Sequence, residues 1–511
     1  MSESYDGFLP LFLSRAVAQP DRIFAKFSDR AISFGDLDRT SSALATWLIG
    51  HGVAAGDRVA LMMRNRPVSL ALMFAIAKID AVWVPVNVAA IGDSLAYILE
   101  HSAAKLIVAD DDVNDAVVAS GIATGRIALG TVAMLAMNEP SELLPSAGNP
   151  DADRPYAIMY TSGTTGRPKG VIVSHRMMRL SGEAVALISA PRDGDVMFMW
   201  EPLFHIGGAQ MIILPLIREI ELALVERFSA SQFWAQVAAT GASHIHFLGG
   251  ILQILLKQPP GPLDRRHGVR VAWGGGCPRD VWRLFEERFG IPIRECYGMT
   301  ECSSITTANL DGTLGSAGKP VPWFDVTLRR ADGSFVDGNE QGEIVVASLQ
   351  PGALTMGYLN NPDATAKALR NGVFHTGDLG SWDASGNMYF HGRISDSARV
   401  RGENVSAFEV ESVAMKHPAV EDCAMIPVAA EIGEQDIKLF VKPKPGASID
   451  PAALSAWLAL RLAPYQQPRY IVVIADFERT PSYRIMKHQL SKCVDDAWDR
   501  DQRYGPGRVP R

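Results

Sequence analysis

The chain has 511 residues, more than one hydrophobic core usually spans, so two or more domains are expected. Hydrophobic residues make up 47% of it, which is ample material for packed cores. The net charge of −7 argues against nucleic acid as the main partner, so any anionic ligand must be held by local cations. The 5 cysteines include no C-x-x-C pair, which favours neither a disulfide framework nor a zinc site.

The N-terminal residues lack the pattern of a targeting segment. No basic region precedes their short apolar stretch, so a signal peptide is not expected. No run reaches the ~18 apolar residues of a membrane span, so stable membrane insertion is not expected either. We therefore expect a soluble, cytoplasmic protein.

Helical and strand patterns alternate along the first four hundred residues or so. A helix is expected from Phe34 to His51, a strand over 59–63, a second helix over 68–79 and a strand over 81–85. Further units are expected at 183–189, 230–240, 243–248 and 279–290. This alternation is typical of parallel sheets covered by helices.

The last hundred residues or so have a different pattern, which predicts a compact α+β domain. Helices are expected over 408–417, with Glu409 and Glu411 on the exposed face, and over 452–462. Strands are expected over 424–428, 437–443 and 470–474. The polar, glycine-led segment 392–397 suits a hinge, and the residues after Trp498 suit a disordered tail.

These patterns predict an α/β fold with a large N-terminal domain of sheets flanked by helices, plus a small β-rich subdomain, and a small α+β C-terminal lid domain. The expected boundaries are 1–394 for the large domain, 395–398 for the hinge, 399–498 for the lid and 499–511 for the tail.

The most informative motif is Tyr160–Gly170, which reads Tyr-Thr-Ser-Gly-Thr-Thr-Gly-Arg-Pro-Lys-Gly between two apolar runs. Glycines let a backbone curl around a ligand, and hydroxyl and amide groups can line the resulting concavity. The motif is neither a Walker A loop nor a dinucleotide-binding turn. It suits a nucleotide polyphosphate.

This loop resembles the phosphate-loop signature of the adenylate-forming (AMP-binding) superfamily, which includes acyl- and aryl-CoA synthetases, luciferases and peptide-synthetase adenylation domains. Further motifs follow in the family's order from about residue 34 to 490. Residues 401–406, Arg-Gly-Glu-Asn-Val-Ser, most resemble crotonobetaine/carnitine-CoA ligase-like members of the acyl-CoA synthetase branch. The resemblance implies ATP, Mg²⁺ and coenzyme A as cofactors and a small carboxylic acid as substrate.

The segment 295–301 matches the family's Tyr-Gly-x-Thr-Glu motif. Tyr297 offers a ring face for adenine, Thr300 can hydrogen-bond the α-phosphate, and Glu301 is an oxygen ligand for Mg²⁺. Asp378 matches the family's ribose-binding carboxylate. The resemblance assigns nucleotide binding to Thr161, Ser162, Gly163, Thr164, Thr165, Gly166, Lys169, Gly275, Gly276, Glu295, Cys296, Tyr297, Gly298, Asp378 and Arg393, and metal binding to Thr165 and Glu301.

The resemblance places an acyl pocket around Trp200, His205, His246, Trp273 and Gly274, with His205 against the reacting carboxylate. Relatives that use α-amino acids have an Asp where this chain has His205, so α-amino acids are disfavoured. A tryptophan-lined pocket favours a short or ring-shaped acid, although ordinary core packing explains the same tryptophans.

The C-terminal motif departs from the family's Thr-x-x-Gly-Lys, because Tyr483 replaces the glycine and Arg484 replaces the catalytic lysine. A guanidinium keeps the charge but not the shape of an ammonium. Lys487 is a second candidate if the segment is helical; alternatively, it is a solvated tail lysine.

The resemblance places the hinge at Asp396 and the CoA-facing surface of the lid at Arg399, Arg401, Gly402 and Glu403. Lys438, Lys442 and Lys444 either attract the CoA phosphates or are solvated surface charges.

These motifs predict an ATP-dependent carboxylic acid–CoA ligase that forms an acyl-adenylate and then a thioester, with release of pyrophosphate and AMP. Two alternatives stay open. One is an adenylating enzyme that loads a carrier protein; the other is an ATP-binding pseudoenzyme, suggested by the missing lysine. A homodimer is compatible with the sequence, which fixes neither the acid nor the oligomeric state.

Overall fold

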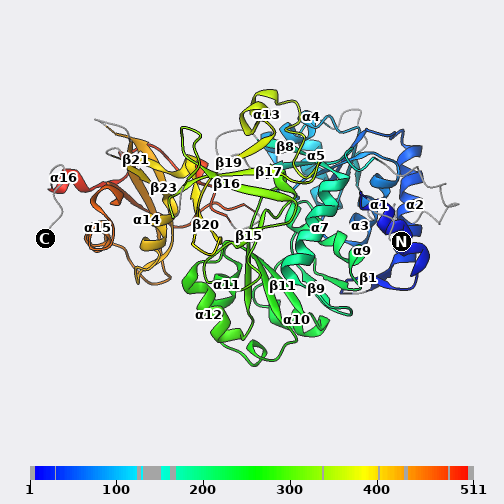
Figure 1. The fold of residues 1–511 in the computed structure, drawn as a ribbon, viewed down its shortest axis with the longest axis horizontal. Coiled ribbons are helices and arrows are strands. Elements are labelled where there is room, and N and C mark those ends of the chain that lie inside the picture. Colours follow the sequence, from blue (N-terminus) through cyan, green and yellow to red (C-terminus); the bar gives the residue numbers. More distant parts are fainter. Residues whose placement is uncertain are drawn as a thin grey trace. The chain divides into compact units, whose positions relative to one another are not determined.

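The computed structural model describes residues 6–28, 30–122, 128–130, 151–161, 168–336, 339–400, 403–430, 435–480 and 484–504, with the backbone alone at 128–130, 395, 399, 403, 404, 503 and 504. The chain forms two compact units (Figure 1). The large unit is residues 1–326 with 346–374, and the small unit is residues 327–345 with 375–511.

One sheet of the large unit has six strands, in the order β6 (Ala128–Gly130), β5 (Leu106–Ala109), β3 (Arg58–Met62), β4 (Val82–Pro85), β7 (Pro155–Thr161) and β8 (Lys169–Ser174). The strands run parallel from β6 to β7, and β8 returns antiparallel to β7. Its connecting helices are α3 (Pro67–Lys78), α4 (Gly92–His101) and α5 (Asn114–Ala119). β5, β3 and β4 are buried or nearly so along their whole length, as expected of parallel strands covered on both faces.

The second sheet has nine strands, in the order β15 (Lys319–Pro320), β14 (Thr307–Ala308), β13 (Ile293–Tyr297), β12 (Val271–Gly275), β11 (His244–Leu248), β9 (Val196–Met199), β10 (Glu221–Leu224), β1 (Ile23–Lys26) and β2 (Ala31–Ser33). From β13 to β1 all pairings are parallel. The carboxyl ends of β9, β11, β12 and β13 therefore share one edge of the sheet, which is where open parallel sheets bind their ligands.

Helices cover both sheets of the large unit. α10 (Phe233–Thr240), α11 (Ile251–Lys257) and α12 (Arg279–Phe289) pack on the second sheet in one hydrophobic cluster. α1 (Leu9–Ala18) and α2 (Phe34–Gly50) pack with α3 beside the first (Figure 1). α7 (His175–Ser189) contacts strands of both sheets, and its Gly182 leaves no room for a Cβ, which would lie 2.4 Å from that of Ile213.

A five-stranded sheet contains β16 (Phe324–Arg329), β17 (Gly342–Ser348), β19 (Val373–Trp382) and β18 (Leu369–Arg370) in that order, with β20 (Met388–Arg393) paired to β19. The division between the units runs through β16, β17 and β19. α13 (Pro362–Ala368) precedes β18.

The small unit also has the predicted α+β pattern. Its four-stranded sheet is β23 (Val420–Ala429), β24 (Gln435–Pro443), β25 (Tyr470–Val473) and β26 (Trp498–Asp499), with α14 (Ala407–Ala414) and α15 (Pro451–Ala459). β21 (Ala398–Val400) and β22 (Glu403–Val405) form a hairpin. The predicted fold class is confirmed: an α/β chain with large N-terminal sheets and helices and a smaller C-terminal domain.

Two expectations about the C-terminal region were wrong. Glu411 is not on an exposed helix face, because its carboxylate accepts the Met425 N–H at 2.6 Å and pairs with Lys487. Ordered structure also continues beyond 498, since β26 pairs with β25 and α16 (Arg500–Tyr504) follows, with Arg500 buried. Residues 505–511 of the predicted tail lie outside the described residues.

The two compact units meet at residues 326/327, 345/346 and 374/375, and not at the predicted boundary of 394. That boundary and the hinge at 395–398 stay predictions. Within the described ranges, no helix is both long enough and apolar enough to cross a membrane.

Candidate active site

Strands β7 and β8, which flank the predicted phosphate loop in the sequence, form an antiparallel hairpin. Thr161 pairs with Lys169 and Tyr160 with Gly170, so the two ends of the loop are held in register. The loop residues Ser162, Gly163, Thr164, Thr165 and Gly166 lie outside the described residues. The ammonium of Lys169 lies 5.0 Å from the ring centre of Tyr358, a cation–π distance.

Glu301 lies close to this hairpin, in the 3₁₀ turn Thr300–Cys302. Tyr358 donates its phenolic hydrogen to one Glu301 oxygen at 2.9 Å. Thr355 ties the segments together, because its N–H donates to the Glu301 carbonyl at 2.9 Å and its hydroxyl to the Ile172 carbonyl of β8 at 2.7 Å. The predicted metal ligand and the end of the predicted phosphate loop are thus brought together through Tyr358.

The Glu301 carboxylate fits a divalent cation. It is 8% exposed, and among the described residues no cation pairs with it and no donor other than Tyr358 reaches it. A buried carboxylate without a counter-charge is costly, and a hard cation such as Mg²⁺ both supplies the charge and prefers oxygen ligands. Thr300, the predicted phosphate-binding neighbour, is buried beside it.

The glycine run after β12 is required by its backbone. Gly274 has φ of 158°, and a Cβ there would lie 1.8 Å from the Phe247 carbonyl oxygen; a Cβ on Gly275 would lie 2.9 Å from the Cys296 carbonyl oxygen. Gly276 has φ of 86°, which side chains rarely adopt. These glycines leave a wall made of backbone alone, as the predicted adenine and acyl surface requires.

Glu295 holds this wall in place. Its carboxylate accepts the N–H groups of Gly276 and Cys277, both at 3.0 Å. Burial raises the pKa of the Glu295 carboxyl from 4.5 to about 7, against the lowering effect of these two hydrogen bonds. Burial likewise raises the pKa of the neighbouring Cys296 thiol, so a thiolate nucleophile is disfavoured there.

Tyr297 ends β13 and is buried, with its carbonyl accepting the Thr306 N–H at 2.8 Å. Gly298 follows where a Cβ would lie 1.8 Å from the Ser304 carbonyl oxygen. This close approach explains why the motif needs glycine between its tyrosine and the turn that carries Glu301.

A buried Glu201–His246 pair stands at the predicted acyl pocket. The two side chains are 2% and 4% exposed, and His246 Nδ1 contacts one Glu201 oxygen directly. The imidazole lies 4.2 Å from the ring centre of Trp273, and Trp200 donates its indole N–H to the His246 carbonyl at 2.9 Å. The described residues offer no hydrogen-bond partner to the second Glu201 oxygen or to the Trp273 N–H.

The sequence analysis did not identify Glu201 as a candidate site residue, although it adjoins the predicted pocket residue Trp200. Its role depends on a partner on another strand, 45 residues away, which no local pattern reveals. A signal was present, because Glu201 is an acidic residue just after the apolar strand 196–199, where a buried carboxylate needs a partner such as His246.

His205 lies at the start of α8 (Ile206–Ala209), where its carbonyl accepts the N–H groups of Gly208 and Ala209. Its ring lies 4.8 Å from that of Phe204. Gly207 faces the acyl residues, since a Cβ there would lie 3.7 Å from His246 Cε1 with no other atom within 4 Å. His205, His246, Trp200 and Trp273 therefore belong to one region of the large unit.

The small unit contains the other predicted nucleotide ligands. Asp378 on β19 is 3% exposed and pairs across the strands with Arg393 on β20, whose Nε lies 3.1 Å from its carboxylate. Arg484 is within electrostatic range of both. Two guanidinium groups and one carboxylate give this cluster a net positive charge, which suits a phosphate.

Lys487 is in a different setting. Its ammonium lies 2.8 Å from Glu411 and 3.7 Å from the predicted hinge residue Asp396. Burial lowers the pKa of Lys487, but these two carboxylates outweigh burial and the net shift is upward. The solvated-tail interpretation of Lys487 was wrong.

The helical arrangement considered for 484–487 was also wrong. Arg479 and Ile485 form an antiparallel bridge, and Thr480 and Arg484 exchange hydrogen bonds through the Thr480 N–H and hydroxyl. A 3₁₀ turn begins only at Lys487. Arg484 thus ends a β-type loop, in which residues 481–483 lie outside the described ones.

The predicted CoA face is only partly described. Arg401 and Gly402 lie outside the described residues, and Arg399 and Glu403 are described by their backbone in the β21–β22 hairpin. Lys438 cannot attract a phosphate, because it is 0% exposed and its ammonium is held by Asp496 at 2.7 Å and by two backbone carbonyls. Lys442 is committed to Asp476 at 3.0 Å.

Comparison with known families gave two matches. The model of the AMP-binding enzyme family matches residues 12–359, and the model of the AMP-binding enzyme C-terminal domain matches residues 409–484. Together they span the sheets of the large unit and most of the small one.

Curated relatives are similar over most of the chain. A sulfoacetate–CoA ligase from Cupriavidus necator is 31% identical over 96% of this chain and 98% of its own length. A 2-succinylbenzoate–CoA ligase from a Geobacillus species is 32% identical over 78% of this chain and 80% of its own. Among solved structures, O-succinylbenzoate coenzyme A synthetase from Bacillus subtilis, in complex with ATP and magnesium ion, aligns with a TM-score of 0.85 at 27% identity, covering 94% of this chain and 98% of that one.

Proposed function

Because the chain belongs to the family of AMP-binding enzymes, in their CoA-ligase branch, we propose that it joins a small carboxylic acid to coenzyme A in two ATP-dependent steps. The acid attacks the α-phosphate of ATP, the bond to the bridging oxygen breaks, and pyrophosphate leaves. The CoA thiol then attacks the acyl carbon with loss of its proton, and AMP leaves.

The observation that carries this proposal is the Glu301–Tyr358–Lys169 arrangement. It puts a buried carboxylate and a cation at the end of a Ser/Thr/Gly hairpin, which together suit a metal-bound polyphosphate. Bound Mg²⁺ would neutralise phosphate charge, held by Glu301 and, on the resemblance, by Thr165.

The nucleotide is proposed to contact residues of both units. In the large unit, Tyr297 and the backbone wall of Gly275 and Gly276 hold adenine, while Thr300 and the loop residues orient the phosphates. In the small unit, Asp378 and Arg393 bind the ribose and phosphate. Arg484, rather than Lys487, meets the developing phosphate charge, because Lys487 is already paired with two carboxylates.

The acid is proposed to be short or ring-shaped and to carry a polar group. The relatives named for sulfoacetate and 2-succinylbenzoate act on acids with a second acidic group. In this chain, the pocket region contains His246, whose Nδ1 contacts Glu201, and the Trp273 Nε1 and second Glu201 oxygen, which have no hydrogen-bond partner among the described residues. Such atoms can bind a polar group of the acid, with His205 at the reacting carboxylate.

Two half-reactions need two arrangements of the site. We place the pivot at Asp396 within 395–398. We propose that the β21–β22 hairpin, with Arg399 and Glu403, faces CoA in the second step, and on the resemblance Arg401 and Gly402 do so too. Closing over the adenylate would protect this mixed anhydride from water.

The deciding experiment supplies ATP, Mg²⁺ and CoA with a panel of short, aromatic and dianionic acids, and measures pyrophosphate release and thioester formation separately. Both products from at least one acid would support the ligase. Pyrophosphate release without a CoA thioester, followed by thioester formation when an acyl carrier protein is added, would favour carrier loading. ATP binding with no pyrophosphate from any acid would favour the pseudoenzyme.

A further inference from the structure

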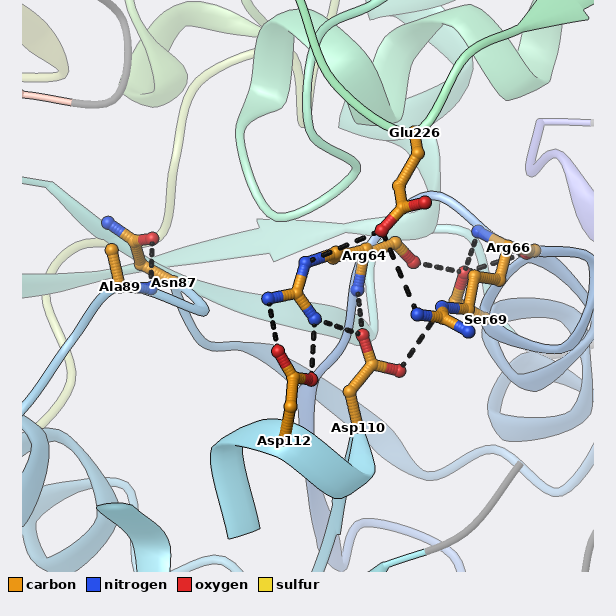
Figure 2. Close-up of polar contacts among 8 residues, drawn as sticks. All are labelled: Arg64, Arg66, Ser69, Asn87, Ala89, Asp110, Asp112 and Glu226. Carbon is orange, nitrogen blue, oxygen red and sulfur yellow. Dashed lines mark hydrogen bonds and ion pairs between the residues drawn. The ribbon is translucent and has the colours of Figure 1, made fainter. Parts of the chain in front are cut away.

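The turn Arg64–Arg66, which follows β3, is braced on both sides (Figure 2). The Arg64 N–H donates to Asp110 at 3.0 Å, and its guanidinium reaches Asp110 and Asp112. The Ser69 hydroxyl donates to the carbonyls at 64 and 66, and accepts the Arg66 N–H at 2.9 Å. Backbone and side chains therefore fix the turn to the carboxyl ends of β3 and β5.

The residue at the centre of this turn, Asn65, faces the second sheet with every polar atom used. Its amide nitrogen donates to the carbonyls of Glu201, at 2.8 Å, and Val225, at 3.3 Å. Its amide oxygen accepts the Leu203 N–H at 2.9 Å. The side chain is 3% exposed, so removing it would leave these backbone groups buried without their hydrogen-bond partner, which is costly.

What Asn65 holds is a segment without regular secondary structure between β9 and α8. This segment, residues 200–205, includes Glu201, whose carboxylate contacts His246, and ends with His205 at the start of α8. A second brace lies beside it, since Glu226, one residue past Val225, is 3.6 Å from Arg64 and 3.7 Å from Arg66 (Figure 2). The segment thus takes its position from the first sheet.

We propose that Asn65 is a positioning residue for the acid-binding side of the site. It contacts neither reactant, and acts by fixing the backbone at 201 and 203, and through it the Glu201–His246 pair and His205. The Glu301–Tyr358 end of the site has no hydrogen bond to Asn65. Loss of Asn65 should therefore impair use of the acid much more than use of ATP.

The functional test rests on the proposed ligase activity. In Asn65→Ala, we expect kcat/KM for the acid to fall about 10- to 100-fold, mainly through KM, with the KM for ATP changed less than about 2-fold. The matched control is Asp112→Ala, which removes the exposed partner of Arg64 in the same turn, leaves Asn65 and Glu226 in place, and should leave both KM values near wild type. Parallel changes in both KM values, or no change in either, would overturn the proposal.

A second measurement does not depend on turnover. Amide hydrogen exchange of peptides covering 200–208 should accelerate in Asn65→Ala and not in Asp112→Ala. If the alanine variant fails to fold, Asn65→Ser leaves a small polar side chain without charge and should show the same faster exchange and the same loss of acid use. Unchanged exchange in a folded variant would refute the positioning role, whereas a wild-type protein that activates no acid would sink only the ligase proposal.

Discussion

At the scale of single residues, Glu301 combines burial, one hydrogen bond from Tyr358 and no paired cation among the described residues. We predict that Glu301→Gln lowers the rate of acid-dependent pyrophosphate release by about 10²–10³, the usual effect of removing one transition-state group.

Tyr358→Phe should lower the rate of pyrophosphate release by about tenfold and raise the Mg²⁺ concentration needed for half-maximal rate, because the Glu301 carboxylate loses its fixed orientation.

The control for this pair is Tyr156→Phe. It removes another buried hydroxyl, which donates to the Met73 carbonyl at 3.1 Å. Tyr156 lies near the start of β7, at the opposite end of the strand from the predicted phosphate loop. It should leave the Mg²⁺ dependence as in wild type. An equal shift in both tyrosine variants would mean that Tyr358 acts through general stability.

Glu295 gives a prediction about pH. Burial raises its pKa from 4.5 to about 7 in the folded protein, so the protonated carboxyl favours folding. This contribution is complete below about pH 4.5 and is lost as the pH rises through about 7. Glu295→Gln is neutral throughout, so the Tm of wild type minus that of the variant should fall between about pH 5 and 8. A pH-independent difference in thermal denaturation would contradict the assignment.

The Glu201–His246 pair predicts a change of specificity. Glu201→Gln removes the charge that orients the imidazole. We expect kcat/KM to fall about tenfold or more for acids with a second polar group, and to change little for alkyl acids of the same length. The measurement compares kcat/KM of wild type and of Glu201→Gln for pairs of acids that differ only in the second polar group. An equal loss on both would indicate a purely structural pair.

At the scale of elements, the β-type loop that ends at Arg484 distinguishes Arg484, the first candidate for the lid cation, from Lys487, the second. We predict that Arg484→Ala slows acyl-adenylate formation by about 10²–10³ and barely slows thioester formation from preformed acyl-adenylate. Lys487→Ala should instead lower Tm, because it leaves Glu411 buried beside Asp396 without its cation. Rapid-quench assays of the two half-reactions test the first claim; the reverse pattern would make Lys487 the lid cation.

The sequence predicted elements well where the pattern is local. The expected helix 34–51 is α2, 68–79 is α3, and 437–443 lies within β24, because the apolar residues that identify each element lie within that element's own segment. It failed where a charge found its partner far along the chain. Lys438 pairs with Asp496 and Glu411 with Lys487, each far along the chain, and the partners of Asn65 lie in the segment after β9 and just after β10, more than 130 residues away.

At the scale of the whole molecule, the chain divides its candidate residues between two compact units. Glu301, Lys169, Tyr297 and the acyl residues belong to the large unit, and Asp378, Arg393 and Arg484 to the small one. Neither unit alone contains a complete set for the proposed chemistry. The link between the half-reactions should therefore depend on backbone freedom near the proposed pivot.

Asp396 ends the 3₁₀ turn Ile394–Asp396 between β20 and β21, which makes it the natural place to test this freedom. Proline fixes φ near −65°, so Asp396→Pro should restrict rotation there. We predict that acid-dependent pyrophosphate release stays within about threefold of wild type while thioester formation falls about tenfold or more. Asp396→Ala is the control, because it removes the same contact with Lys487 but leaves the backbone free. If proline and alanine behave alike, the effect comes from the lost ion pair, and the pivot lies elsewhere in the chain.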